Sequence, residues 1–265
     1  MKILRSIVLL SALLFTQLVI NSCSLLFMAV GNGDAQTRTI NLDAFDTVEF
    51  SGVSDLVYVQ TKGEFRVEIT IDSNLMEYIE VEQNGDQLTI DTSLFVNIIP
   101  TVQDVITVYA PELLALELSG TGDFTAAGIS ADSRDLVILN SGTGDCSIET
   151  LAADSLVFTS SGTGGVSLNN VLLSGRLNYT SSGTGSATVT GSASTLSLTK
   201  SGTGDFDGRE LAVSTANVTC SGTGSAYIRT SGGISGTLSG TGNLYCYGNG
   251  ISWVLDTGTG SVIRR

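Results

Sequence analysis

The sequence contains no histidine, and several other residue types are scarce. Without histidine, Ser-His-Asp and Cys-His catalysis and most zinc sites are excluded. The 265 residues include only two prolines and one tryptophan, and charged residues make up 14% of the chain. Glycine, by contrast, occurs 31 times. Together with abundant Val, Ile, Leu and Thr, this composition favours short strands and tight corners over long helices.

Basic residues are also few, at 12 Lys and Arg against 26 Asp and Glu, which gives a net charge of −14. Removal of residues 1–22 takes away Lys2 and Arg5 but no acidic residue, and the net charge becomes −16. Such a surface disfavours nucleic acids and anionic lipids. We therefore expect no nucleic-acid partner, and we expect the charge to serve solubility or cation binding.

More than half of the chain is one short unit repeated eight times. Each unit carries the tetrapeptide Ser-Gly-Thr-Gly or, once, Thr-Gly-Thr-Gly, at intervals of 18 to 22 residues. The copies begin at Ser119, Ser141, Ser161, Ser182, Ser201, Ser221, Ser239 and Thr257. A fixed period near 20 residues predicts an array in which each unit buries its apolar face against its neighbours.

Apolar residues occupy fixed columns relative to the first residue of the tetrapeptide. Five residues after it stand Phe124, Cys146, Val166, Ala187, Phe206, Ala226, Leu244 and Val262. Three residues before it stand Leu116, Ile138, Phe158, Tyr179, Leu198, Val218, Gly236 and Val254. Further columns lie five before and seven after, with Ser, Thr, Asn and Asp in between. Spacing of two is the strand period, so the columns predict inward faces of short strands.

These observations predict an all-β fold, a parallel β-helix with about 20 residues per coil. A propeller blade needs about 40 residues, whereas one coil stacked ~4.8 Å above the last needs far fewer. In this fold the Ser-Gly-Thr-Gly units are corners, where glycine supplies a positive φ or a close backbone approach. Aligned Thr and Ser side chains then line the outer faces.

Residues 36–118 are more charged and less regular than residues 119–265. The segment Ser51–Asp55 is a degraded copy of the corner, and residues 73–79 are compatible with one helical turn. Terminal units of a solenoid are atypical because one face meets solvent. We therefore predict a single domain over residues 36–265, in which 36–118 form the first coils and an N-terminal cap, and 119–265 form the regular coils.

The N-terminus has the features of a secretory signal in residues 1–22. Lys2 and Arg5 precede a 14-residue apolar segment, Ile7–Ile20, which is short for a membrane span. The segment ends in Ile20-Asn21-Ser22-Cys23, which resembles a bacterial lipoprotein box. This predicts lipid attachment at Cys23, followed by a flexible segment, 23–35. Cleavage after Ala35 and an uncleaved anchor are the alternatives.

The other three cysteines are expected to be buried thiols. Cys146 and Cys246 lie in core columns five coils apart, about 24 Å at the strand spacing, which is too far for a disulfide. Cys220 precedes its corner and shares a column with neither of them.

Acidic and aromatic residues supply the candidate sites. Asp123 and Asp145 both follow a corner, so they should lie on adjacent coils about 5 Å apart. Such a pair suits calcium binding or acid–base chemistry on sugars, although Asp is also a favoured turn residue. Asp132 and Asp154 form a second such pair. Tyr245 and Tyr247 are the best exposed aromatic pair for contact with a glycan. No confident metal, cofactor or catalytic residue emerges.

The order of motifs resembles a known family. The motifs are the lipoprotein box, Gly31-Asn32-Gly33, Arg38-Thr39-Ile40, Phe45-Asp46-Thr47-Val48, Ser51–Asp55, Asp72-Ser73-Asn74-Leu75, Leu88-Thr89-Ile90 and the repeated Ser-Gly-Thr-Gly-Asp. Over residues 23–260 they look like the bacterial "putative auto-transporter adhesin, head GIN domain" lipoproteins. The resemblance implies a right-handed parallel β-helix on the cell envelope, and it carries no catalytic residues with it.

The leading functional hypothesis is a non-enzymatic adhesin or envelope scaffold, exported and lipid-anchored in the outer membrane, that presents its Thr/Ser faces to a glycan or host surface. One alternative is a polysaccharide-processing or polysaccharide-binding β-helix that uses the stacked acidic residues Asp123 and Asp145. Another is a scaffold that assembles through its last coil. We expect a monomer, because Arg264 and Arg265 blunt the final edge, with an end-to-end dimer as the alternative.

Overall fold

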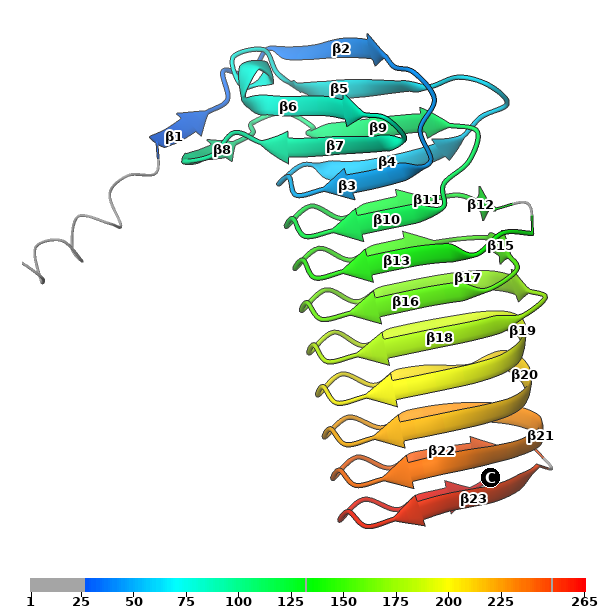
Figure 1. Ribbon diagram of the computed structural model, residues 1–265. Helices are drawn as coiled ribbons and strands as arrows, with labels where there is room; N and C mark the ends of the chain where they lie inside the picture. The colour runs from blue at the N-terminus through cyan, green and yellow to red at the C-terminus, as the bar shows by residue number, and fades with distance from the viewer. Residues whose placement is uncertain (1–26, 132, 249) are drawn as a thin grey trace, which may run out of the picture.

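The protein is a parallel β-solenoid with a cap at its N-terminal end, as the computed structural model in Figure 1 shows. The structure describes residues 27–131, 133–248 and 250–265. The predicted signal segment 1–22, the lipidation site Cys23 and Asp132 lie outside these residues. No helix in the described ranges is both long and apolar enough to cross a membrane.

Each regular coil has one strand before the corner and one after it. The strands before the corner stack in parallel in the order β3 (Thr47–Phe50), β10 (Ala115–Leu118), β13 (Leu136–Asn140), β16 (Leu156–Ser160), β18 (Arg176–Ser181), the ends of β19 (Ala187–Lys200), β20 (Phe206–Cys220) and β21 (Ala226–Leu238), and β23 (Ile251–Asp256). We call this layer the front sheet.

The strands after the corner form a second stack, which we call the back sheet. Its order is β4 (Asp55–Gln60), β11 (Phe124–Ala126), β14 (Cys146–Ile148), β17 (Val166–Leu173), the starts of β19, β20 and β21, β22 (Leu244–Tyr247) and β24 (Val262–Arg264). A short third side holds β12 (Ile129–Ser130) and β15 (Leu151–Ala153). In later coils this side merges into the long bent strands β19 to β21.

The core lies between the two sheets, where the predicted columns meet. Residues such as Phe124, Ile138 and Leu177 are at most 1% exposed. Aromatic rings stack from coil to coil inside it: Phe158 and Tyr179 have ring centroids 5.3 Å apart at 12°, and Phe206 lies 5.0 Å beyond Tyr179. The prediction of an all-β parallel solenoid with inward apolar columns is confirmed.

The corners need glycine for close approach. A Cβ on Gly142 would lie 2.2 Å from the carbonyl oxygen of Gly120, and one on Gly162 would lie 1.8 Å from that of Gly142. None of the corner glycines, all of which the structure describes, has a positive φ. Of the two roles expected for glycine, close backbone approach is therefore the one in use. The degraded copy also serves as a corner, because Thr121 N donates to Gly52 O at 3.0 Å.

The first coil, β3 and β4, is separated from the second by an insertion that forms the cap. The insertion contains β5 (Arg66–Asp72), the 3₁₀ turn Met76–Tyr78, β6 (Ile79–Asn84), β7 (Gln87–Thr92), β8 (Val96–Ile99) and β9 (Val105–Ala110). β7 and β9 continue the front and back sheets in parallel for one more layer. β6 and β5 then pair antiparallel with them, and β2 (Ala35–Asn41) pairs antiparallel with β5. The predicted helical turn at 73–79 is present as this 3₁₀ turn.

The segment after Cys23 differs from the flexible connection expected for 23–35. Phe27–Val30 forms β1, which pairs with β8, and β2 already begins at Ala35. The reason is the buried carboxylate of Asp72. Its oxygens accept hydrogen bonds from Gly33 N at 2.7 Å and from Thr101 N and Oγ1, both at 2.7 Å. Burial alone would raise the pKa of Asp72, but these hydrogen bonds outweigh it and lower the pKa to about 2.

The buried-thiol expectation is confirmed for Cys146, Cys220 and Cys246. Burial raises the pKa of Cys146 to about 12 and that of Cys220 to about 11. At neutral pH both are therefore protonated and poor nucleophiles.

A glycine-to-alanine exchange at a corner tests the stacking. Gly162→Ala should lower the free energy of unfolding by about 1–3 kcal/mol, because the new methyl group collides with the Gly142 carbonyl oxygen. Gly63→Ala is the matched control, since its Cβ would meet nothing within 4 Å. Urea unfolding of both variants measures the difference, and equal stability of the two would contradict the close-approach role of the corners.

Candidate functional site

The predicted acidic pair Asp123 and Asp145 lies side by side on adjacent coils. Asp145 N donates to Asp123 Oδ1 at 2.8 Å, and Gly165 N donates to Asp145 Oδ1 at 2.7 Å. Asp123 N in turn bonds to Asp55 Oδ1 at 3.1 Å. Each carboxylate is therefore directed at the backbone of the next coil and satisfies an N–H group there.

The same contact continues through the later coils with other polar residues. Ser225 N donates to Asp205 Oδ1 at 2.7 Å, and Ser261 N donates to Asn243 Oδ1 at 2.9 Å. Asn243 N donates to Ser225 Oγ at 3.2 Å, so the side chains of Asn and Ser perform the same task as Asp, which is the turn role considered for these residues. No group of three or more His, Cys, Asp or Glu side chains suited to a metal ion occurs within the described ranges. Of the second predicted pair, Asp154 accepts a hydrogen bond from Ser174 Oγ.

The predicted tyrosines lie on the outer face of the back sheet. Tyr245 stacks on Tyr227 of the preceding coil, with ring centroids 4.7 Å apart and planes within 3°. Tyr247 follows two residues later on the same outer face, in register with Arg229. Tyr227 was absent from the predicted pair, although it occupies the same repeat position as Tyr245. Aligning outward as well as inward columns would have found it.

A guanidinium group extends this aromatic surface. Arg209 lies over the Tyr227 ring at 5.1 Å from its centroid. Arg209 Nε donates a hydrogen bond to Asp207 Oδ1 at 2.9 Å, and this hydrogen bond raises the pKa of Arg209. We call Arg209, Tyr227, Tyr245 and Tyr247 the tyrosine platform. Tyr227 and Tyr245 turn their ring faces toward each other, so the platform offers ring edges beside a paired charge.

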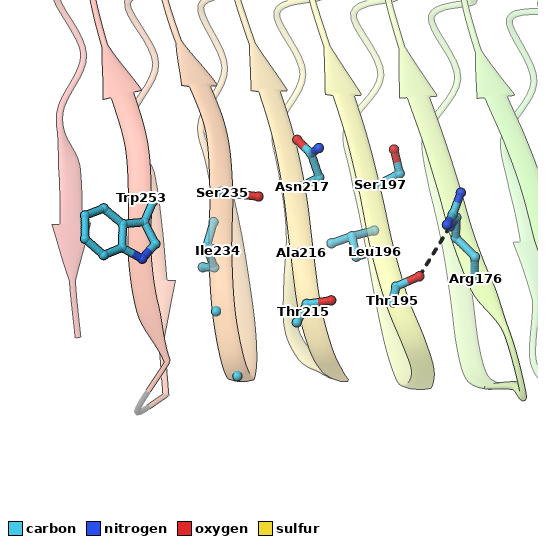
Figure 2. Close-up of a pocket in the computed structure, with 12 residues that line it drawn as sticks. Arg176, Thr195, Leu196, Ser197, Thr215, Ala216, Asn217, Ile234, Ser235 and Trp253 are labelled. Atoms are coloured by element: carbon cyan, nitrogen blue, oxygen red, sulfur yellow. Dashed lines mark hydrogen bonds between the residues drawn. The ribbon is translucent and has the colours of Figure 1, made fainter.

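A groove runs along the opposite, front sheet over five neighbouring strands, β18, β19, β20, β21 and β23 (Figure 2). Two rows of outward side chains border it. One row is Arg176, Thr195, Thr215 and Gly233; the other is Ser197, Asn217, Ser235 and Trp253. Its volume is about 550 Å³. We call it the Trp253 groove.

The two ends of the groove differ in chemistry. Trp253, the only tryptophan of the chain, stands at one end with 76% of its surface exposed. Arg176 stands at the other end, and its Nε donates to Thr195 Oγ1 at 3.3 Å. Gly232 and Gly233 of β21 line the groove near its Trp253 end, where earlier coils carry side chains, and in Figure 2 the indole extends from β23 away from Ile234 and Ser235.

This arrangement suits a polar ligand with an apolar face. Hydroxyl and amide groups at the coil spacing supply hydrogen bonds, and an exposed indole supplies a flat surface for stacking. Sequence reasoning missed Trp253, although a signal was present. Its repeat position holds Ser197, Asn217 and Ser235 in the three preceding coils, so a large aromatic residue there interrupts a column of small polar residues.

Substitution of Asp145 distinguishes a structural ladder from a metal or catalytic site. Asp145→Asn should keep the melting temperature, because Asn243 already fills the equivalent position. Asp145→Ala should lose about 0.5–1.5 kcal/mol of stability, since the Gly165 N–H then loses its partner. Thermal melts with and without calcium check both. A calcium-dependent shift that disappears in Asp145→Asn would instead establish a metal site.

Solved structures with this fold come from Parabacteroides and Bacteroides species. A "putative adhesin" from Parabacteroides merdae is 24% identical, has a TM-score of 0.75, and the match covers 89% of this chain and 98% of that one. A "putative lipid binding protein" from Parabacteroides distasonis is 21% identical with a TM-score of 0.78, covering 90% and 99%. A "putative adhesin" from Bacteroides fragilis is 19% identical with a TM-score of 0.70, covering 89% and 99%. At these identities the likeness shows the fold alone.

A comparison with curated proteins found no match. The family comparison is more specific, because a single family model matches residues 44–250, which include the first coil, the cap insertion and the repeats up to the start of the last coil. The chain therefore belongs to the family described as "Putative auto-transporter adhesin, head GIN domain".

Proposed function

We propose that this protein is a non-enzymatic adhesin of the bacterial cell envelope that binds a carbohydrate chain in the Trp253 groove. The observation that carries the proposal is the exposed indole at the end of a row of hydroxyl and amide side chains. Tryptophan is enriched among the residues that carry most of the binding energy at interfaces. Membership of an adhesin family supports the same class of function.

The direction of the groove suits an extended polymer. Its rows run along the solenoid axis, so equivalent polar groups recur at the strand spacing of ~4.8 Å. A sugar chain laid along them meets a similar set of partners at each coil. Its less polar ring face packs on Trp253, and Arg176 hydrogen-bonds to hydroxyl or carboxyl groups at the far end.

Binding is favoured over cleavage. Glycoside hydrolysis uses two carboxyl groups on either side of the scissile bond. The described residues that line the Trp253 groove offer hydroxyls, amides, an indole and one guanidinium, but no carboxyl group. The Asp123 and Asp145 carboxylates are directed at backbone N–H groups on another part of the coil. The proposed activity is therefore recognition without chemistry.

The tyrosine platform is a second candidate surface, supported by the parallel Tyr227 and Tyr245 rings. Because these rings cover each other's faces, the platform offers ring edges beside Arg209 and Asp207 to a ligand. The hollow beside it, lined in part by Asp207 and Arg209, has a volume of about 190 Å³ against about 550 Å³ for the Trp253 groove, so we assign the platform the secondary role of a weaker contact.

Removal of the indole tests the binding site. Trp253→Ala should weaken binding to a responsive glycan about 30-fold, the equivalent of about 2 kcal/mol for a central aromatic contact. Leu255→Ala is the matched control, because Leu255 is exposed on the same strand but does not line the groove. A glycan array identifies the ligand, and titration calorimetry compares the variants. Equal affinity of native protein and Trp253→Ala would refute the groove assignment, and loss in Tyr245→Ala instead would select the platform.

The proposal includes export and lipid attachment at Cys23 in the outer membrane. Cys23→Ala should abolish incorporation of labelled palmitate and remove the processed, lipid-anchored form from the membrane fraction. Fractionation of cells that express either form measures this. Palmitate labelling that persists in Cys23→Ala would place the lipid elsewhere, and native protein without label would refute the anchor.

A further inference from the structure

The ribbon of β1 and β8 carries an exposed apolar surface that is unlike the rest of the molecule. It is a separate two-stranded parallel sheet that projects from the cap (Figure 1). Six large apolar side chains on it and its preceding loop are between 36% and 78% exposed: Phe27, Met28, Val30, Leu94, Phe95 and Ile99. We call these six residues the apolar tip. They account for half of the exposed large apolar side chains among the described residues.

Backbone hydrogen bonding and core packing hold the apolar tip in a defined conformation. Phe27 N donates to Phe95 O at 2.8 Å, which brings the two aromatic residues together at the end of the ribbon. Phe95 holds a positive φ of 65°, a strained conformation for a bulky residue. The inner side of the ribbon packs Ala29 and Ile98 into the core, so the outer side is rigidly presented.

Charge is missing from the ribbon and its loops. Residues 27–33 and 93–103 contain no Asp, Glu, Lys or Arg, in a chain with 26 acidic and 12 basic residues. The absence of such groups favours entry into the apolar part of a bilayer, because burying a charge in an apolar medium is costly.

The apolar tip lies close to Cys23 in the chain, and this closeness points to a membrane as the surface that covers the tip. Phe27 is four positions after Cys23 in the chain, so the two Cα atoms lie at most about 14 Å apart. A lipid on Cys23 would therefore hold the tip at the level of the lipid headgroups.

We propose that the apolar tip docks into the surface of the bilayer that holds the Cys23 lipid, so that the cap faces the membrane and the Trp253 groove points away from it. The proposal rests on the lipid anchor of the proposed function. It assigns the apolar tip to the membrane, as a second attachment beside the acyl chains. A second attachment converts a tethered molecule into an oriented one.

Bromine quenching of a tryptophan placed in the tip tests the docking. The lipid-modified protein with Leu94→Trp and Trp253→Phe is reconstituted into phosphatidylcholine vesicles with brominated acyl chains. Its emission should fall and shift to shorter wavelength, because the indole enters the acyl region. The native protein, with Trp253 as its only tryptophan, is the matched control and should keep its emission. Leu94 is 78% exposed, so the exchange leaves the fold undisturbed.

Several results would overturn the docking. An unquenched Trp at position 94 in protein that has incorporated palmitate refutes it directly. Quenching of native Trp253 to the same degree means that the solenoid lies flat on the membrane, which also refutes the proposed orientation. Dimers in lipid-free buffer that shield position 94 from acrylamide would assign the tip to a second copy of the chain.

A second variant, which carries no lipid, distinguishes failure of the lipid anchor from failure of the docking. Residues 23–265 with Cys23→Ser and the same two tryptophan exchanges carry no lipid. At high vesicle concentration this chain should still show quenching at position 94, more weakly than the lipidated form. If the native protein incorporates no palmitate, the lipid anchor is refuted. The quenching of the unlipidated chain then decides the docking alone: a quenched Trp at position 94 supports the docking, and unchanged emission refutes it.

Discussion

The stacking of glycine on glycine at the corners is the constraint on which the rest of the solenoid depends. Each corner passes over the one below so closely that a single methyl group, as at Gly142 or Gly162, would strike a carbonyl oxygen. The gap admits only a hydrogen atom at these positions, so each coil meets its neighbour in one register. Once the corner is in register, the strands on both sides of it are too, and the inward columns meet as a continuous core.

The same register creates the outer surface. Because equivalent positions repeat at the strand spacing, any outward column becomes a row along the axis. Where the column holds Asp, Asn or Ser after the corner, the row is a ladder in which each side chain satisfies the backbone of the next coil. Where it holds Tyr227 and Tyr245, the row is an aromatic stack. One column loses its side chain at Gly233, and a neighbouring column gains an indole at Trp253. These two columns border the Trp253 groove.

The two ends of the molecule are specialised for different contacts. At one end, β7 and β9 cover the first coil in parallel, and the antiparallel β5 and β6 follow. The parallel ribbon of β1 and β8 carries the apolar tip there, and the buried carboxylate of Asp72 binds the segments that follow its two strands. At the other end lie the groove and the tyrosine platform. Eight strand steps separate β3 from β23, about 38 Å at the strand spacing. In the proposed arrangement this length is a spacer that holds the binding surface clear of the membrane.

The sequence by itself determined the repeat, the corner positions and the inward columns, because each of these is a short-range pattern with a fixed period. Even the degraded corner at Ser51–Asp55 could be identified from its likeness to the others. Only the tertiary structure decided the cap, because its pairings join segments far apart in the chain: Phe27 meets Val96, and Thr47 meets Gln87. Such pairings have no periodic signature, and their register is set by packing rather than by local residue type. The rows of the Trp253 groove follow the repeat, whereas the apolar tip belongs to this second class, since it is a surface that exists only once strands distant in the chain lie side by side.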